Sequence, residues 1–309
     1  MTPPDKLHLI ERAAERLIRD GAVPAGLGAG AQPGTDLAPP PAAALPPPLP
    51  PPLPPPLPSA PDPSAPAAAP RRMIDLALMV AGGLADGDGR SRIAEEFRLV
   101  QHQILRSAFG ADSAGDHANL VMVTSSRPNE GKTFTALNLA ASIARRGDHR
   151  VLLVDADAKH GSLSDLLGLN DQPGLLEIAA DPALDLGACL IGTPFATLSV
   201  LPVGRQRGHR GDLFASNSML RLVQALGDRY TDRLVVLDVA PCLSTSDPAA
   251  LAAAVGQVLF VVEAEKTQRD EVEAALDLIQ TCPTITLLLN KVKMSTSHSF
   301  GAYSYAYSS

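Results

Sequence analysis

The chain contains no tryptophan, and aromatic residues make up only 4% of its 309 residues. Hydrophobic residues nevertheless reach 45%, so a sizeable core can form, and that core must be aliphatic. No apolar run approaches the roughly 18 to 20 residues that a membrane-spanning helix needs. The sequence therefore predicts an aliphatic globular core and no helix that crosses a bilayer.

Cysteine is also scarce, because only Cys189, Cys242 and Cys282 are present and they lie far apart. Such spacing fits neither a disulfide framework nor a zinc site, and the seven histidines show no metal-ligand spacing. The first residues include Asp5, Glu11 and other charges and lack the apolar core of a secretion signal. We therefore expect a cytoplasmic protein.

An excess of basic residues is missing as well. Lys and Arg number 26 against 33 Asp and Glu, which gives a net charge of -7. Nucleic-acid binding relies on a basic surface that neutralises phosphates. The balance therefore argues against nucleic acid as the main partner.

The first 70 residues divide into two segments that precede the folded part. Within residues 1–23, apolar residues at three- and four-residue steps predict an amphipathic helix over residues 5–20. A plain surface helix and a docking helix fit this pattern equally well. Residues 24–70 are rich in Pro and Ala, and proline fixes φ and removes a hydrogen-bond donor. We expect a disordered, semi-rigid polyproline spacer there, in preference to a ligand for an aromatic groove.

Residues 71–294 alternate apolar runs with helical periodicity, starting with a predicted helix over residues 91–106. Continuous apolar strands that alternate with helices are typical of a mainly parallel sheet covered on both faces, a three-layer α/β/α fold. The predicted strands are Leu120–Thr124, Val151–Val154, Leu198–Leu201, Leu234–Leu237, Val258–Val262 and Ile285–Leu289. The predicted helices between them cover residues 134–146, 216–228, 246–255 and 269–280.

The tail, residues 295–309, is small, polar and without periodicity, so we expect it to be flexible. Three of the four tyrosines, Tyr303, Tyr305 and Tyr307, lie in its last seven residues. Chance seldom gathers a scarce residue in this way. An incidental low-complexity tail is the less favoured interpretation, and these tyrosines are candidate phosphate acceptors.

The segment that carries the clearest chemistry follows the first predicted strand and reads Ser126-Arg-Pro-Asn-Glu-Gly131-Lys132-Thr133. It fits the P-loop pattern G-x-x-x-x-G-K-[ST], with Ser126 in place of the first glycine. The loop amides and the helix N-terminus cradle phosphates, Lys132 neutralises the β- and γ-phosphates, and the Thr133 hydroxyl is a Mg²⁺ ligand. The candidate ATP-binding residues are Asn129, Glu130, Gly131, Lys132, Thr133, Phe134 and Asn290.

Polar side chains also close three later predicted strands. Asp155 and Asp157 end the second strand, and Asp238 ends the fourth and fits a Walker B aspartate. Acids at the carboxyl end of a buried strand need a cation, so they can approach a magnesium-bound phosphate; capping of the following helix is the alternative for Asp155 and Asp157. Asn290 closes the last strand, where its amide either reads the adenine edge or, almost as plausibly, supports a turn.

Taken in order, TSSRPNEGKT, the DAD sequence and LDVAP resemble the bacterial tyrosine kinase family, whose P-loop enzymes are unrelated to eukaryotic kinases. The segments EEFRLVQHQIL, NLAASIA, VVEAEKT and LLLNKV look like the tyrosine autokinases associated with exosortase and exopolysaccharide loci. The resemblance covers residues 71–309 well and residues 5–20 weakly. It implies the P-loop NTPase form of the α/β/α fold.

The resemblance also implies a function. Members transfer the γ-phosphate of ATP to tail tyrosines of a neighbouring subunit and regulate exopolysaccharide biosynthesis and chain length. By this likeness Lys132 binds phosphate, Asp155 is the candidate base, and Thr133, Asp157 and Asp238 lie on the metal side. ATP and Mg²⁺ are the implied cofactors. A homo-oligomeric ring and a membrane copolymerase or chain-length determinant are the implied partners, at the inner face of the cell membrane.

Three departures from the family pattern stand out. The subunit-contact motif E-x-x-R-x-x-R matches Glu95 and Arg98, but Gln101 replaces the second arginine. The segment after Asp157 reads Ala-Lys-His-Gly instead of a basic Arg-Arg-Pro run, so Lys159 keeps the charge but loses the bidentate fork of arginine. The Walker B strand continues Val-Ala-Pro rather than Thr-Pro-Pro. These changes predict weaker assembly or activity.

Two other functions remain open from the sequence. A partitioning or cell-division ATPase of the same superfamily carries a signature lysine where this chain has Arg127. Such ATPases often add a membrane-binding helix or a basic DNA-binding face, and neither pattern is visible. A non-catalytic regulator that binds ATP and reports to a membrane polysaccharide machine is the second alternative.

Overall fold

The computed structural model describes residues 72–85, 92–110, 115–205, 214 and 216–293, all within the unit that runs from Pro66 to Ser309. The predicted N-terminal helix, the proline-rich spacer and the three tail tyrosines lie outside the described residues. Among the residues described, no helix has both the length and the apolar character to cross a membrane.

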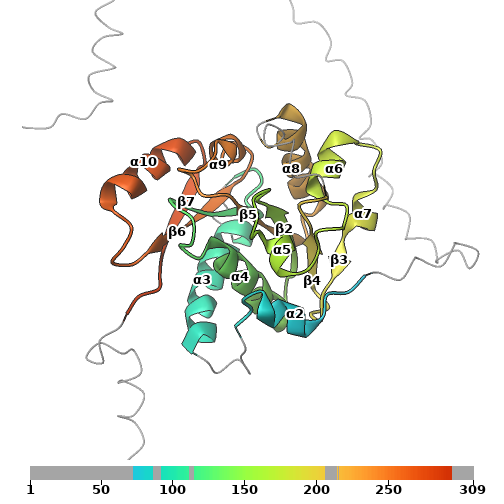
Figure 1. Cartoon of the computed structure of the whole chain (residues 1–309), viewed down its shortest axis with the longest axis horizontal. Coiled ribbons are helices and arrows are strands. Elements are labelled where there is room, and N and C mark those ends of the chain that lie inside the picture. Colours follow the sequence, from blue (N-terminus) through green and yellow to red (C-terminus); the bar gives the residue numbers. More distant parts are fainter. Residues whose placement is uncertain (1–71, 86–91, 111–114, 206–213, 215, 294–309) are drawn as a thin grey trace, which may run out of the picture. The chain divides into compact units, whose positions relative to one another are not determined.

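A seven-stranded sheet in the order β3-β4-β2-β5-β1-β6-β7 forms the centre of the fold (Figure 1). Every strand pair is parallel except β3 with β4. Strands β1, β2 and β5 are buried almost throughout, as expected where helices cover both faces. The strands are β1 Leu120–Ser125, β2 Arg150–Ala156, β3 Ile191–Gly192, β4 Leu198–Leu201, β5 Arg233–Val239, β6 Gln257–Glu263 and β7 Thr284–Asn290.

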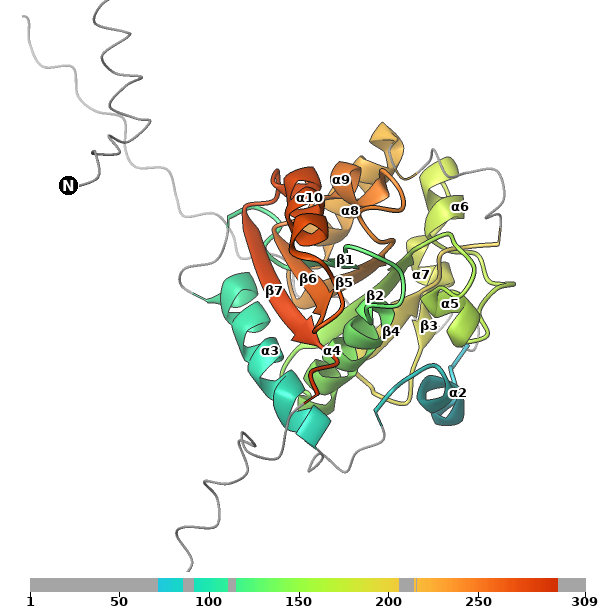
Figure 2. The same ribbon diagram turned by 60° about the vertical axis from the view of Figure 1, so that its left-hand side comes forward.

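Helices lie on both faces of this sheet (Figures 1 and 2). Alternate residues of the central strands enter two separate apolar clusters, one shared with α3 and α4 and the other with α6, α8 and α10. This alternation follows from the two-residue period of a strand. The helices are α2 Leu76–Ala81, α3 Arg92–Phe109, α4 Lys132–Arg146, α5 Leu163–Leu166, α6 Leu175–Ala180, α7 Leu186–Cys189, α8 Asn217–Arg229, α9 Asp247–Leu251 and α10 Arg269–Ile279.

The predicted three-layer α/β/α fold and all six predicted strands are confirmed. The helix predicted over residues 246–255 is too long, since α9 ends at Leu251 and the Ala254 amide donates to the Leu251 carbonyl in a tighter turn. The sequence pattern did not predict β3 or the short helices α2, α5, α6 and α7. Elements this short depend on tertiary contacts, because an isolated helical turn is unstable.

Candidate functional site

The phosphate-binding loop connects β1 to α4 at the carboxyl edge of the sheet. Its backbone takes left-handed conformations at Asn129 (φ 68°) and Gly131 (φ 98°), and Gly131 is the N-cap of α4. A Cβ at residue 131 would overlap the side-chain amide of Asn290. Glycine is therefore needed here both for its φ angle and for space, and it leaves the first amides of α4 at the mouth of the loop.

Side chains from the ends of β6 and β7 hold this loop from outside. The Asn290 Nδ2 donates to the Glu130 carbonyl at 2.8 Å, and Lys291 Nζ donates to the Asn129 carbonyl at 2.5 Å. The Glu130 carboxylate is buried and accepts from the Arg127 amide at 2.8 Å and from the Thr267 hydroxyl. The sequence had not predicted roles for Thr267 and Lys291, although both lie in the segments that carried the family resemblance. Glu130 acts here through its side chain as a brace of the loop.

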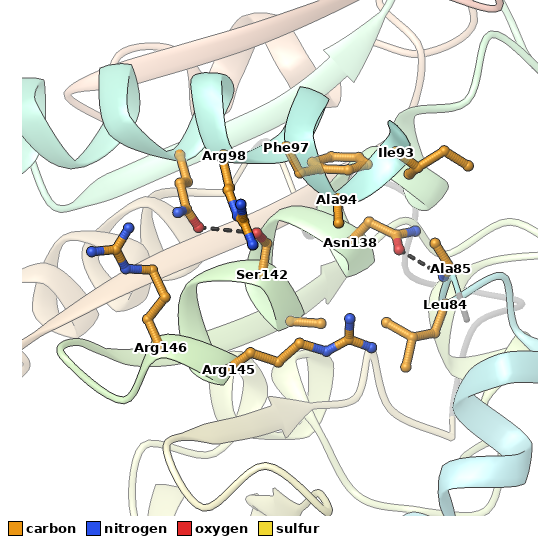
Figure 3. A pocket seen from close by; sticks show the side chains of 12 residues that line it. Leu84, Ala85, Ile93, Ala94, Phe97, Arg98, Asn138, Ser142, Arg145 and Arg146 are labelled. Atoms are coloured by element: carbon orange, nitrogen blue, oxygen red, sulfur yellow. Dashed lines mark hydrogen bonds between the residues drawn. The ribbon is translucent and has the colours of Figure 1, made fainter. Parts of the chain in front are cut away.

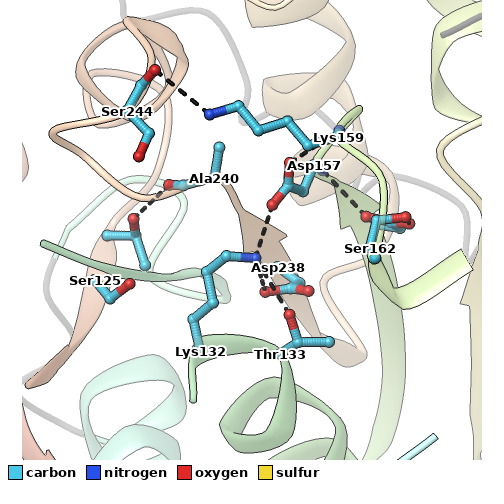
Figure 4. A network of polar contacts seen from close by, with 12 residues as sticks. Ser125, Lys132, Thr133, Asp157, Lys159, Ser162, Asp238, Ala240 and Ser244 are labelled. Atoms are coloured by element: carbon cyan, nitrogen blue, oxygen red, sulfur yellow. Dashed lines mark hydrogen bonds and ion pairs between the residues drawn. The ribbon is translucent and has the colours of Figure 1, made fainter. Parts of the chain in front are cut away.

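Lys132 lies at the centre of the predicted site (Figure 4). Its Nζ is 2.8 Å from Asp157 Oδ2 and 3.5 Å from Asp238 Oδ1, and it donates to Thr133 Oγ1 at 3.2 Å. Burial works to lower the pKa of Lys132, but the charges of Asp238 and Asp157 outweigh it, so the pKa lies above its usual value. The side chain is therefore a fixed cation that is poised between two acids from neighbouring strands.

Asp238 provides the best argument that this site can hold a metal ion. The residue is fully buried at the end of β5, and its Oδ2 has no hydrogen-bond partner. Burial raises the pKa of Asp238 to about 6, with Lys132 acting in the opposite direction. An unpartnered buried carboxylate oxygen beside Thr133 and Asp157 fits a hydrated Mg²⁺, which keeps several waters and takes few protein ligands. Within the described part of the chain, no group of three or more His, Cys, Asp or Glu forms a metal cage.

Asp155 faces its own loop more than it faces Lys132. Its Oδ2 accepts from the Ser164 amide at 2.7 Å and the Ser162 hydroxyl at 2.8 Å, and its Oδ1 accepts from the Asp157 amide at 3.1 Å. It is fully buried, and burial raises its pKa. These contacts match the capping alternative, since Ser162 and Ser164 open α5. The carboxylate thus anchors the segment that follows β2.

Lys159 bridges the two loops that flank the site. Its Nζ donates to the Ser244 carbonyl at 3.4 Å, and its amide donates to Asp157 Oδ1 at 3.1 Å (Figure 4). The departure from the family's arginine therefore preserves a cation that joins the loop after β2 to the loop after β5. The sequence could not show this bridge because 85 residues separate its two ends.

A cavity of about 730 Å³ adjoins the loop on the side of α3. Gly131, Phe134 and Asn290 form one wall, and Ile93 and Phe97 of α3 form the other. A cavity of this size, mostly apolar with a few polar groups, is of the kind that takes a small organic ligand. Phe134 and Asn290, both predicted from the sequence, thus lie together beside the phosphate loop.

The departure at Gln101 has a structural reason. Glu95 and Arg98 form an exposed ion pair at 2.5 Å on α3, whereas Gln101 is buried and its Oε1 accepts from the Ser142 hydroxyl of α4 at 3.0 Å. Ser142 and Arg98 line a second cavity, of about 200 Å³, between these helices. Figure 3 shows how their side chains lie. Gln101 therefore joins α3 to α4 and does not extend the exposed pair.

The site gives one prediction for the free energy of unfolding. The pKa of Asp238 is raised from the usual aspartate value of 3.8 to about 6 in the folded protein. Between these two pH values, folded Asp238 keeps a proton that the unfolded chain has released. Rising pH in this window therefore lowers stability through Asp238. We expect wild type to lose stability relative to Asp238→Asn across this window when both are unfolded with urea in EDTA. Lys132, Asp155 and Asp157 surround position 238 in both proteins, so parallel curves of unfolding free energy against pH would contradict the prediction.

The structure brings the candidate residues Asn129, Glu130, Gly131, Lys132, Thr133, Asp155, Asp157, Asp238 and Asn290 to one edge of the sheet, with Phe134 in the adjoining cavity. Buried acids, a buried lysine and a helix N-terminus can bind a phosphate with its metal and hold its charge away from water. Tyr303, Tyr305 and Tyr307 lie outside the described residues.

The family model of the CobQ/CobB/MinD/ParA nucleotide binding domain matches residues 121–300. The succinoglycan biosynthesis transport protein ExoP of Rhizobium meliloti is 31% identical over 217 residues, which are 67% of this chain and 26% of ExoP. The tyrosine-protein kinase YwqD of Bacillus subtilis is 26% identical over 205 residues, which are 66% of this chain and 85% of YwqD. The solved kinase domain of VpsO is 28% identical with a TM-score of 0.53, and the match covers 66% of this chain and 100% of that domain.

The predicted resemblance to bacterial tyrosine kinases is therefore confirmed, and the subgroup stays a prediction. The chain spans only 25% to 28% of the length of several other curated tyrosine kinases that it matches.

Proposed function

We propose that this chain, which belongs to the CobQ/CobB/MinD/ParA nucleotide-binding domain family, is an ATP-dependent protein-tyrosine autokinase. Its proposed acceptors are Tyr303, Tyr305 and Tyr307 in the tail of a neighbouring subunit. The observation that carries the proposal is the Lys132 contact with both Asp157 and Asp238, beside a phosphate loop. The similarity to YwqD and to the VpsO kinase domain supports the choice of tyrosine as acceptor.

In this proposal the loop amides and Lys132 bind the β- and γ-phosphates of ATP, and the base enters the cavity between Phe134 and α3. Mg²⁺, when bound, would neutralise charge on the transferred phosphoryl group. Thr133, Asp157 and Asp238 would hold it, and the unpartnered Asp238 Oδ2 supports that assignment. Lys132 pairs with Asp157 and Asp238 in this structure, and with ATP bound its ammonium group would also contact the phosphates.

The transfer itself joins the tyrosine oxygen to the γ-phosphorus and breaks the bond between that phosphorus and the β,γ-bridging oxygen, which leaves as part of ADP. The phenolic proton goes to Asp155, the candidate base. Its raised pKa favours proton uptake, but the three hydrogen bonds that its carboxylate accepts from Asp157, Ser162 and Ser164 all come from its own loop. Asp155 therefore reaches an acceptor only if the segment from Asp157 to Ser164 opens.

The cellular role follows from the relatives' names. ExoP is named a succinoglycan biosynthesis transport protein, which supports a role in exopolysaccharide biosynthesis and export. We propose a homo-oligomeric ring at the inner face of the cell membrane, held there by a polysaccharide copolymerase or chain-length determinant. The exposed Glu95–Arg98 pair is available for a subunit contact, whereas the buried Gln101 is not.

The partitioning-ATPase alternative has less support. Its signature lysine reaches a phosphate from the position of Arg127, but Arg127 Nη1 is 3.1 Å from Glu271 of α10. The side chain is thus engaged on the outer side of the loop. The same family membership leaves a non-catalytic ATP-binding regulator as the remaining alternative.

An incubation with ATP and Mg²⁺ followed by phosphotyrosine detection tests the proposal. Wild type should gain phosphotyrosine, and the variant with Tyr303, Tyr305 and Tyr307 all changed to Phe should not. An ATPase or a regulator would give no signal in either protein. A signal that persists in the triple variant would place the acceptor elsewhere.

The role of Asn290 gives a second prediction. One of its amide hydrogens is used by the Glu130 carbonyl, and the remaining amide atoms are proposed to read the adenine edge. We expect Asn290→Ala to lower the preference for ATP over GTP by about tenfold, measured by titration calorimetry, because a lost base-edge hydrogen bond costs about 1 kcal/mol or more. Equal losses of affinity for both nucleotides would instead leave Asn290 with only its bracing role.

A further inference from the structure

The two edges of the sheet differ in the strand that forms them. At one edge the antiparallel strand β3 covers β4, and Met73 adds a further bridge to Gly192 of β3. At the other edge β7 is the last strand and pairs with β6 on its inner side. An outer strand presents unpaired amides and carbonyls, which proteins commonly cover with another segment.

The outer strand also leaves apolar side chains in water. Leu287 and Leu289 are 58% and 62% exposed, although Ile285 on the same face packs in the cluster of α10. Leu278 of α10 is 43% exposed as well. On this face of β7, α10 therefore covers the amino-terminal part around Ile285. The carboxyl-terminal part, with Leu287 and Leu289, stays exposed.

The tail has the matching pattern. The described residues end at Lys293, three residues after β7, and residues 294–309 follow directly. Tyr303, Tyr305 and Tyr307 alternate with Ser304 and Ala306. In an extended strand this two-residue period puts all three rings on one face and only small side chains on the other. Tyrosine is also among the residues that favour strands.

We propose that the unphosphorylated tail folds back and adds to the outer edge of β7 as an antiparallel eighth strand over residues 302–308. In the register that places Tyr303 opposite Leu289 and Tyr305 opposite Leu287, Tyr307 lies opposite Ile285. Directly opposite residues share a face, so the rings of Tyr303 and Tyr305 cover the exposed Leu289 and Leu287, and the Tyr307 ring lies beside Ile285. Residues 291–301 make the connection, and closing a loop of about ten residues costs little more than closing a shorter one.

Phosphorylation would reverse this docking, a consequence that rests on the proposed function. Each phosphate adds about -1.5 to -2 charges and cannot stay against leucine side chains. The unphosphorylated tail is thus docked on its own subunit until it undocks to serve as acceptor, and the phosphorylated tail does not dock again.

Amide hydrogen exchange on the full chain, dephosphorylated and without nucleotide, tests the docking independently of any kinase activity. We compare wild type with the double variant Tyr303→Pro/Tyr305→Pro, because in this register the tyrosine amides face β7 and a proline there cannot donate a hydrogen bond to it. Ser309→Pro, outside the strand, is the matched control. The β7 amides that point away from β6 should exchange on the order of tenfold faster in the double variant and at the wild-type rate in the control.

The exposed Leu287 supplies a reciprocal variant. Leu287→Ser should speed exchange of the amides in residues 302–308. Identical β7 exchange in wild type and the double proline variant would overturn the proposal. Protection of β7 that grows with protein concentration and survives the prolines would also overturn it, because a second copy would then occupy the edge.

Discussion

Replacing Lys132 by Met is expected to lower ATP-dependent phosphotyrosine formation by about 10² to 10³-fold, the usual cost of removing one donor that stabilises transition-state charge. Lys132 is the buried cation that contacts both Asp157 and Asp238. Without it, the γ-phosphate would meet two carboxylates with no lysine between them. The measurement is the initial rate of phosphotyrosine formation at saturating ATP and Mg²⁺.

Lys266→Met is the matched control, because Lys266 is exposed and pairs with Glu263 at 3.2 Å outside the phosphate loop. That variant should retain the wild-type rate within about twofold, since exposed ion pairs contribute little. A Lys132→Met rate that equals the control would remove the lysine from the proposed chemistry.

The second large effect is expected at Asp155, in stability as well as in rate. In Asp155→Asn one carboxylate oxygen becomes an NH₂ group, which cannot accept a hydrogen bond. In one orientation of the amide the bonds from Ser162 and Ser164 are lost, and in the other the bond from the Asp157 amide is lost. Leaving buried donors unpaired costs about 2 to 3 kcal/mol. We therefore expect Asp155→Asn to unfold at a lower urea concentration and to lose phosphotyrosine formation.

Asp157→Asn separates the two roles. Lys132 still pairs with Asp238 when Asp157 is replaced, so Asp157→Asn should lose less stability than Asp155→Asn. It should nevertheless lose phosphoryl transfer to tyrosine. If Asp155→Asn keeps the wild-type rate once its folded fraction is allowed for, Asp155 is an anchor of the loop and not the base. If it loses stability no more than Asp157→Asn, the anchoring role is wrong.

The parts of the fold that the sequence predicted are those governed by local pattern. Continuous apolar runs marked β1, β2 and β5, because strands buried on both faces need apolar residues at every position. The phosphate loop was recognisable because its chemistry demands Gly131, Lys132 and Thr133 in one short stretch. The order of the acids along the chain then placed Asp157 and Asp238 at the same edge of the sheet.

What the sequence could not predict depends on residues that are distant in the chain. Asp155 resembles Asp157 in the sequence, and only the return of Ser162 and Ser164 over its carboxylate distinguishes them. The bracing of Glu130 by Thr267 joins positions 137 residues apart. Likewise, the sequence showed only that Gln101 replaces an arginine of the family motif, and the packing of α3 on α4 that buries it could not be read from the local pattern.

The central claim is that the phosphate held at this site passes to tyrosine in the same protein. Intact-protein and peptide mass spectrometry after incubation with ATP and Mg²⁺ tests it most directly. The account predicts up to three added phosphate groups, all within the peptide that contains Tyr303, Tyr305 and Tyr307. Release of ADP and inorganic phosphate with no mass added to that peptide would contradict it.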